Sequence, residues 1–173
     1  MTSLYHKSIE PLIASTKVLI IDDDYYMRKV IRSLLLAIGI KDTLDASNGS
    51  EGLEAICSAQ PDIVILDWEM PGMTGADFMR IVRSPETFQC PQIPVIMLTG
   101  HVERDRVVEA IKLGVHEFLC KPVSAKALYD RIVSIRTRPR PMVRFGNYYG
   151  PEPRKIVSNS RQLTDSLEPV WVI

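Results

Sequence analysis

The chain has 173 residues, with 21 basic and 21 acidic side chains. A chain of this length forms one domain with appendages, and its balanced charge gives no argument for binding nucleic acid or an anionic membrane surface. Its three cysteines lie far apart, in no metal-binding or redox spacing, and its longest apolar patch, residues 34–40, is too short to span a bilayer. We therefore expect a soluble cytoplasmic protein.

Five short apolar runs alternate with segments of helical periodicity. The runs predict strands at residues 18–21, 43–46, 63–66, 95–98 and 115–119, and helices are expected at 25–38, 50–59, 75–83, 104–113 and 124–136. Strands that alternate with helices over short connections form a parallel sheet with helices on both faces. The predicted fold class is therefore α/β, with a doubly wound five-stranded parallel sheet.

The two ends of the chain differ from this pattern. Residues 1–16 form an N-terminal extension, in which we expect one short helix interrupted near Pro11. The alternating core occupies residues 17–137. Residues 138–173 are rich in Pro and Arg, lack amphipathic periodicity and contain no helix-turn-helix, so they are interpreted as a tail rather than a second domain.

Acidic residues follow two of the predicted strands. Asp22, Asp23 and Asp24 come after the first strand and Asp67 after the third. Ligands of an open parallel sheet bind at the carboxyl ends of its strands, where these acids would meet. Asp24 is interpreted as a helix N-cap. The other acids repel one another unless a cation neutralises them, and oxygen-only ligands favour Mg²⁺.

Two more polar residues follow the last two strands. Thr99 ends the fourth and Lys121 the fifth. Taken alone, a threonine after a strand is often a cap, and a lysine before a proline is often a solvated turn residue. Together with the acids they would form one crevice that holds a cation and a phosphoryl group.

The chain resembles the receiver domains of two-component response regulators over residues 17–136. The resemblance is carried, in order, by VLIIDDD, YYMRKV, VILDWEMPGMTG, VIMLTG and FLCKP. It implies a flavodoxin-like sheet of strand order 2-1-3-4-5. It also implies that Asp67 is the phosphoacceptor, and that Mg²⁺ is bound by Asp22, Asp23, Asp67 and the backbone carbonyl of Glu69.

The same resemblance assigns the remaining site residues. Thr99 and Lys121 would contact the phosphoryl oxygens. Phe118 would act with Thr99 as the switch, although it could simply be a core aromatic. Lys121 and Pro122 match a position where receivers often have a cis peptide bond. Glu69 and His101 would tune the phosphoryl lifetime, and ordinary exposed loop residues are an equal alternative.

As a receiver, the chain would be a signalling domain rather than an enzyme. It would take a phosphoryl group from a histidine kinase or histidine phosphotransfer protein, phosphorylate and dephosphorylate itself, and signal through altered protein contacts to an unidentified target. No nucleic-acid or membrane partner is expected. A homodimer could form through the helix at 104–113, the strand at 115–119 and the helix at 124–136, or through the tail.

Two questions stay open at this level. FGNYYGPEPRK resembles a segment after some stand-alone bacterial receivers, so the tail either docks on a protein surface or is a linker. The alternative function is a haloacid-dehalogenase-type phosphatase with Asp67 as nucleophile and Glu69 as acid. Chain order argues against it, because that family places its nucleophile on an early strand.

Overall fold

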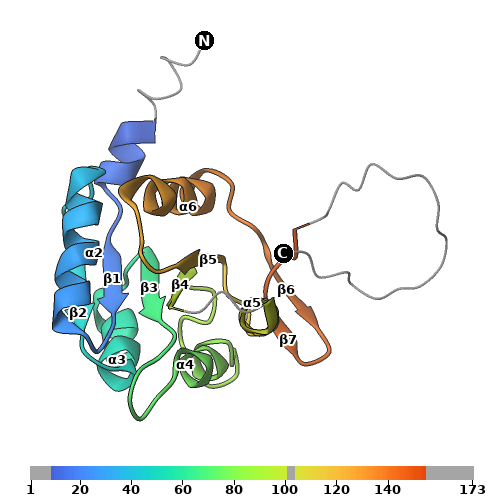
Figure 1. Ribbon diagram of the computed structural model, residues 1–173. Coiled ribbons are helices and arrows are strands. Elements are labelled where there is room, and N and C mark those ends of the chain that lie inside the picture. Colours follow the sequence, from blue (N-terminus) through green and yellow to red (C-terminus); the bar gives the residue numbers. More distant parts are fainter. Residues whose placement is uncertain (1–8, 101–103, 155–173) are drawn as a thin grey trace.

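The computed structural model describes residues 9–100 and 104–154, which form a parallel sheet between two helical layers and a separate small hairpin (Figure 1). The strand order β2-β1-β3-β4-β5 confirms the flavodoxin-like prediction. The strands are β1 (Val18–Ile21), β2 (Thr43–Ala46), β3 (Ile63–Asp67), β4 (Val95–Thr99) and β5 (Glu117–Cys120).

Five helices cover the sheet, and none of the described helices is long and apolar enough to cross a membrane. One face is covered by α2 and α6, and the other by α3, α4 and α5. Their bounds are Tyr25–Ala37 for α2, Gly49–Ala59 for α3, Gly75–Val82 for α4, Arg104–Lys112 for α5 and Ala125–Thr137 for α6.

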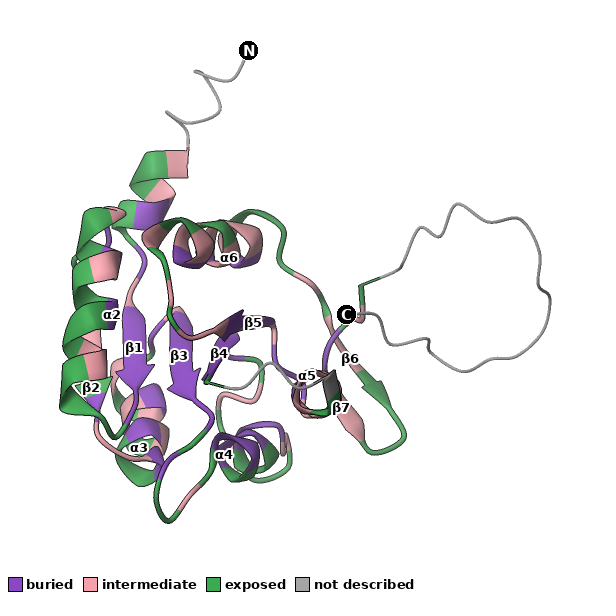
Figure 2. Cartoon of the chain, viewed as in Figure 1, coloured by how far each residue is buried: buried purple, intermediate pink, exposed green. Residues whose placement is uncertain are grey.

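The apolar strands are buried because each contributes side chains to both faces of the sheet. Along β1, Val18 and Ile20 join the core under α2 and α6, while Leu19 and Ile21 join the core under α3 and α4. Figure 2 shows the result, with buried strands between helices whose outer surfaces are exposed. This rigid sheet places the residues that follow its strands.

Local side-chain chemistry sets most helix boundaries. Asp24 caps α2 as predicted, because its carboxylate accepts the backbone N–H groups of Tyr26 and Met27. Asn48 caps α3, so this helix begins one residue before the predicted start. At β5 the prediction was wrong by two residues, since the Val115 N–H still bonds to the Ala110 carbonyl of α5.

The N-terminal extension is partly described. Residues 9–14 form one helical segment that includes Pro11, so the predicted interruption does not occur within it. The Pro11 carbonyl accepts the Ser15 N–H, a bond that does not need the N–H that proline lacks. Ile13 is buried in the core under α2 and α6. Residues 1–8 lie outside the described part of the chain.

The tail begins with a β-hairpin that the sequence analysis did not predict. Its antiparallel strands are β6 (Met142–Phe145) and β7 (Tyr148–Pro151). The two-residue turn between them begins with Gly146 at φ 55°, the backbone conformation that a tight hairpin turn needs at this position. The signal for it was the dipeptide Gly-Asn between aromatic residues. Trp171 and the rest of residues 155–173 lie outside the described part.

The hairpin packs on the domain near the start of β5. A Cβ atom on Gly114 would lie 2.7 Å from the Tyr149 carbonyl oxygen, so the two backbones are in close contact. Arg83, which follows α4, is buried there and donates hydrogen bonds to the carbonyls of Gly114 and Ile93. The described part of the tail therefore docks on its own domain.

Candidate functional site

Three carboxylates meet at the carboxyl end of the sheet. The register pairs Ile21 of β1 with Leu66 of β3, so the next residues, Asp22 and Asp67, are neighbours. Asp22 is 1% exposed and Asp67 5%, while Asp23 is exposed. One carboxylate oxygen from each of the three lies within 4.8 Å of the others. The structure thus brings these predicted site residues together.

The ammonium group of Lys121 lies between the two buried carboxylates. Its Nζ is 2.8 Å from Asp67 Oδ1 and 3.1 Å from Asp22 Oδ2. Burial alone would lower the pKa of Lys121, but its contacts with Asp67 and Asp22 raise it. The lysine is therefore fully charged at neutral pH.

The pKa of Asp67 is raised by burial, although the hydrogen bond and charge of Lys121 act in the opposite direction. The carboxylates of Asp22 and Asp23 add to the increase. Three carboxylates thus face one ammonium group, and the site still favours added positive charge. Carboxylate oxygens are the ligands of a hard divalent cation, so this donor set fits Mg²⁺.

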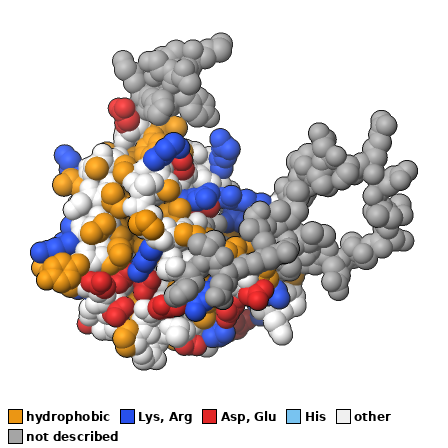
Figure 3. Space-filling view, in the orientation of Figure 1, with side chains coloured by type: hydrophobic (Ala, Val, Ile, Leu, Met, Phe, Trp, Pro, Cys, Tyr) orange, Lys and Arg blue, Asp and Glu red, His pale blue; other side chains and the backbone are white. Residues whose placement is uncertain are grey.

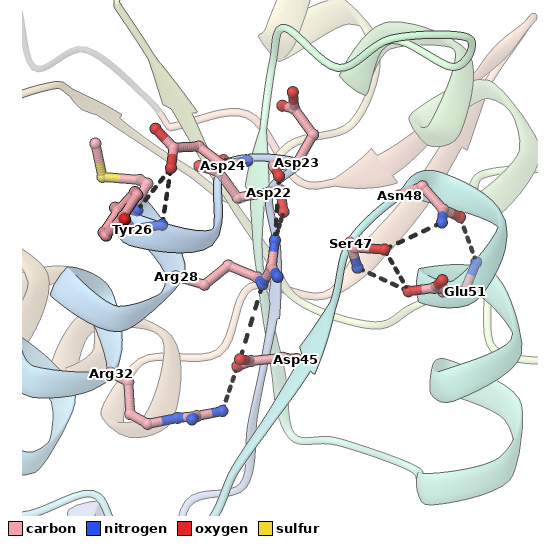
Figure 4. A network of polar contacts seen from close by, with 11 residues as sticks. Asp22, Asp23, Asp24, Tyr26, Arg28, Arg32, Asp45, Ser47, Asn48 and Glu51 are labelled. Carbon is pink, nitrogen blue, oxygen red and sulfur yellow. Dashed lines mark hydrogen bonds and ion pairs between the residues drawn. The ribbon is translucent and has the colours of Figure 1, made fainter.

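The loop that carries Asp22 and Asp23 is fixed by hydrogen bonds between side chains and the backbone. Figure 4 shows Arg28 of α2 beneath the loop and Asp24 directed toward the start of the helix. The Arg28 guanidinium donates to the carbonyls of Asp22 and Asp23, at 2.6 and 3.3 Å, and Asp22 Oδ1 accepts the Asp24 N–H at 2.9 Å. Arg28 also pairs with Asp45 at 3.8 Å. Sequence analysis did not identify this role of Arg28.

A backbone hydrogen bond holds Thr99 and Lys121 side by side. Thr99 ends β4 and is fully buried, and its carbonyl accepts the Lys121 N–H at 2.8 Å. The Lys121–Pro122 peptide bond is cis. Phe118 on β5 is half-buried and packs against the core under α3, α4 and α5. His101 lies outside the described residues.

The loop after Asp67 lies close to the start of α4. The Gly75 N–H donates to the Trp68 carbonyl at 2.8 Å. A Cβ atom on Gly75 would lie 2.8 Å from the Asp67 carbonyl oxygen, so glycine is needed for this approach. The sequence analysis included Gly75 in the motif VILDWEMPGMTG but did not identify this contact.

The rim of the site includes a residue that sequence analysis missed. The exposed Glu69 side chain pairs with Arg106 of α5 at 2.7 Å, and the Arg106 guanidinium lies 6.0 Å from the centre of the Trp68 ring. No motif marks Arg106, because only the packing of α5 brings it near residues so distant in sequence.

Comparison with known proteins agrees with this geometry. Residues 18–133 match the response regulator receiver domain. The chain is 38% identical over 122 residues to the chemotaxis protein CheY of Pseudomonas aeruginosa, covering 70% of this chain and 97% of that protein. It is 34% identical over 122 residues to CheY-3 of Vibrio cholerae, covering 70% and 92%.

A solved structure is also similar. The receiver domain of the Francisella response regulator 1452 superposes with a TM-score of 0.65 at 31% identity, covering 72% of this chain and 98% of that one. The phosphatase alternative finds no support in these similarities. The chain therefore belongs to the response regulator receiver domain family.

Proposed function

We propose that Asp67 accepts a phosphoryl group from the phosphohistidine of a histidine kinase or phosphotransfer protein. The observation that supports this most directly is the Lys121 ammonium, held between the buried carboxylates of Asp22 and Asp67. A phosphoryl group on Asp67 would bring negative oxygens to a fixed positive charge. Phosphoryl transfer needs chiefly such charge neutralisation and in-line positioning.

In this transfer an Asp67 carboxylate oxygen attacks phosphorus in line with the scissile N–P bond. An O–P bond forms, the N–P bond breaks, and its electron pair remains on the donor histidine. Lys121 and the Thr99 hydroxyl would bind the phosphoryl oxygens. Mg²⁺, which supplies further charge neutralisation when bound, would be held by Asp22, Asp23, Asp67 and the Glu69 carbonyl.

The acyl phosphate formed on Asp67 would be hydrolysed within the same site. The domain would thus catalyse its own phosphorylation by small acyl phosphates and its own dephosphorylation. Glu69 and His101 are the residues expected to tune the lifetime. The ion pair of Glu69 with Arg106, whose guanidinium lies near the Trp68 ring, supports this role because it holds a charged side chain beside the loop that follows Asp67.

The output would be a change in protein contacts. Thr99 would move toward the phosphoryl group and Phe118 would rotate inward behind it, altering the surface of α5, β5 and α6. That surface, or the tail, would bind a downstream protein or a second copy of the chain in the cytoplasm. For this role we assign the receiver unit to residues 17–137, with an extension before it and a tail at 138–173.

Labelling with acetyl phosphate and Mg²⁺ tests the proposal. A phosphate-retarding gel should show a slower band for the wild type and none for Asp67→Asn. Asp130→Asn is the matched control, because Asp130 is a surface aspartate paired only with Lys126 among the described residues. Absence of an Asp67-dependent band, with acetyl phosphate and with a cognate kinase alike, would refute the proposal.

A further inference from the structure

An open cavity of about 600 Å³ lies at the opposite end of the sheet from Asp67. It is bordered by the last turns of α6, the start of β5 and the segment that leads into β6. Its wall combines arginines with a few apolar and polar side chains: Gln92, Pro94, His116, Glu117, Arg131, Ser134, Ile135, Arg138, Pro139, Arg140, Met142 and Arg154.

The charge of this wall is strongly unbalanced. Four guanidinium groups line the cavity, and among its described lining residues Glu117 is the only acid. The formal net charge of the whole chain is zero, so the positive charge is local rather than general. In Figure 3 several Lys and Arg side chains gather on the part of the visible face that adjoins the residues drawn in grey.

The carboxylate of Glu117 already has partners among the residues that line the cavity. The Glu117 side chain is 5% exposed and lies 3.5 Å from Arg131, while its other oxygen accepts hydrogen bonds from Arg154 and from Ser134, the latter at 3.2 Å. Arg140 has backbone partners instead, since it donates to the carbonyls of His116 and Glu152. Glu117 therefore cannot neutralise the cavity.

His116 neither adds nor removes charge. Its Nδ1 faces two donors, Arg83 at 3.3 Å and the Val95 N–H at 3.4 Å, so this nitrogen is the unprotonated one. Burial, followed by the charges of Arg83 and Arg140, lowers the pKa of His116 to about 2. Burial and the nearby Arg154 also lower the pKa of Arg140. Burial is the larger cause of both shifts, and the contributions of neighbouring arginines add to it.

Attachment of the hairpin explains only part of this cluster. It accounts for Arg140 and Arg154, whose hydrogen bonds join the segment around the hairpin to the start of β5 and to α6. It does not account for Arg138, which has no side-chain partner in the described part of the chain. It also does not explain Arg131 Nε, a buried N–H group that has no hydrogen-bond partner among the described residues.

We propose that this cavity binds a small molecule that carries a diphosphate or triphosphate group. Planar guanidinium groups bind phosphate oxygens in pairs, and Arg131 and Arg138 have N–H donors without a partner among residues 9–100 and 104–154. The volume falls within the range of about 300–1,000 Å³ that is typical of small-molecule sites. Ile135 and Met142 give the wall an apolar part that can contact the remainder of such a ligand.

Calorimetric titration of the full-length protein with ATP and with inorganic pyrophosphate tests the site. The titrations are done with EDTA, so that no divalent cation draws phosphate to the carboxylates around Asp67. We expect saturable binding of ATP and pyrophosphate, no binding of adenosine, and affinity about tenfold weaker or more for Arg138→Glu, because a charge-assisted hydrogen bond is lost. Arg138→Lys should be intermediate, since it keeps the charge but not the planar fork.

Lys126→Glu is the matched control. It makes the same charge change near the start of α6, whose C-terminal end is followed by Arg138, at a side chain that is 84% exposed and outside the cavity. Equal losses in Arg138→Glu and Lys126→Glu would mean non-specific attraction and would overturn the proposal, as would failure of both probes to bind a wild type shown to be folded by circular dichroism. Unchanged binding in Asp67→Asn would separate this cavity from the phosphoacceptor site.

Discussion

Asp67→Asn should stabilise the protein when no divalent cation is present. Lys121 Nζ lies 2.8 Å from the Asp67 carboxylate. One oxygen each of the Asp22 and Asp23 carboxylates lies within 4.8 Å of an Asp67 carboxylate oxygen. At an effective dielectric constant of about 20, the ammonium attracts the Asp67 carboxylate by about 6 kcal/mol, and a carboxylate at the 4.8 Å limit repels it by about 3.5 kcal/mol. Attraction and repulsion nearly cancel, so burial of the charge decides the balance.

Proton linkage gives the direction of the stability change in Asp67→Asn. The pKa of Asp67 is raised in the folded protein, so its ionised form costs stability at every pH above the unfolded value. Asparagine is close in shape and uncharged, and it removes this cost. We expect the free energy of unfolding to rise by about 1 kcal/mol, the scale of a typical single substitution.

Urea unfolding followed by circular dichroism, in EDTA and in excess Mg²⁺, measures the effect. Asp130→Asn should change stability by less than about 0.5 kcal/mol, because Asp130 is exposed. A hundredfold excess of Mg²⁺ over its Kd should stabilise the wild type by about 2.7 kcal/mol and the variant by less, since Asn lacks the anionic ligand. A variant less stable than the wild type in EDTA would refute the charge argument.

Two further substitutions test the packing around the two sites. The pKa of His116 is about 2 in the folded state against 6.5 in the unfolded chain, so the wild type should lose about 1.4 kcal/mol per pH unit as the pH falls below 6.5. His116→Asn keeps a hydrogen-bond acceptor but does not titrate in this range, so its stability should not fall in the same way. Parallel dependence of the unfolding free energy on pH in the variant and the wild type would contradict this prediction. Gly75→Ala would place Cβ 2.8 Å from the Asp67 carbonyl and should lower the unfolding free energy by about 1–3 kcal/mol. Gly100→Ala, with no described atom within 4 Å, should cost much less, and equal costs would refute the steric explanation.

Much of the fold could be predicted because its signals are local. The run of Val18 to Ile21 is apolar at every position, as expected of a strand buried on both faces, and the structure begins and ends β1 at these residues. Asp24 could be assigned as a cap because its partners are two and three residues away. The bounds of β2 were also predicted correctly, and the remaining three strands were in the predicted order, with errors of one or two residues at their ends.

The C-terminal hairpin shows why other features were missed. Its strands alternate weakly, and an isolated two-stranded hairpin is marginal in water. Contact with the domain stabilises it, through the close approach at Gly114 and the hydrogen bond from Arg140 to the His116 carbonyl. Those contacts join segments more than twenty residues apart in sequence, so no local pattern announces them.

The sequence by itself determined the order of the elements and the residues that follow each strand, because burial pattern and capping depend on near neighbours. It thereby placed the three carboxylates, Thr99 and Lys121 at one edge of the sheet. Only the tertiary structure decided how their charges balance, since distance and burial set the pKa of Asp67. Only it joined Arg106 to Glu69 and gathered four arginines around the cavity that Glu117 also lines, because such contacts depend on how separate helices and the tail pack.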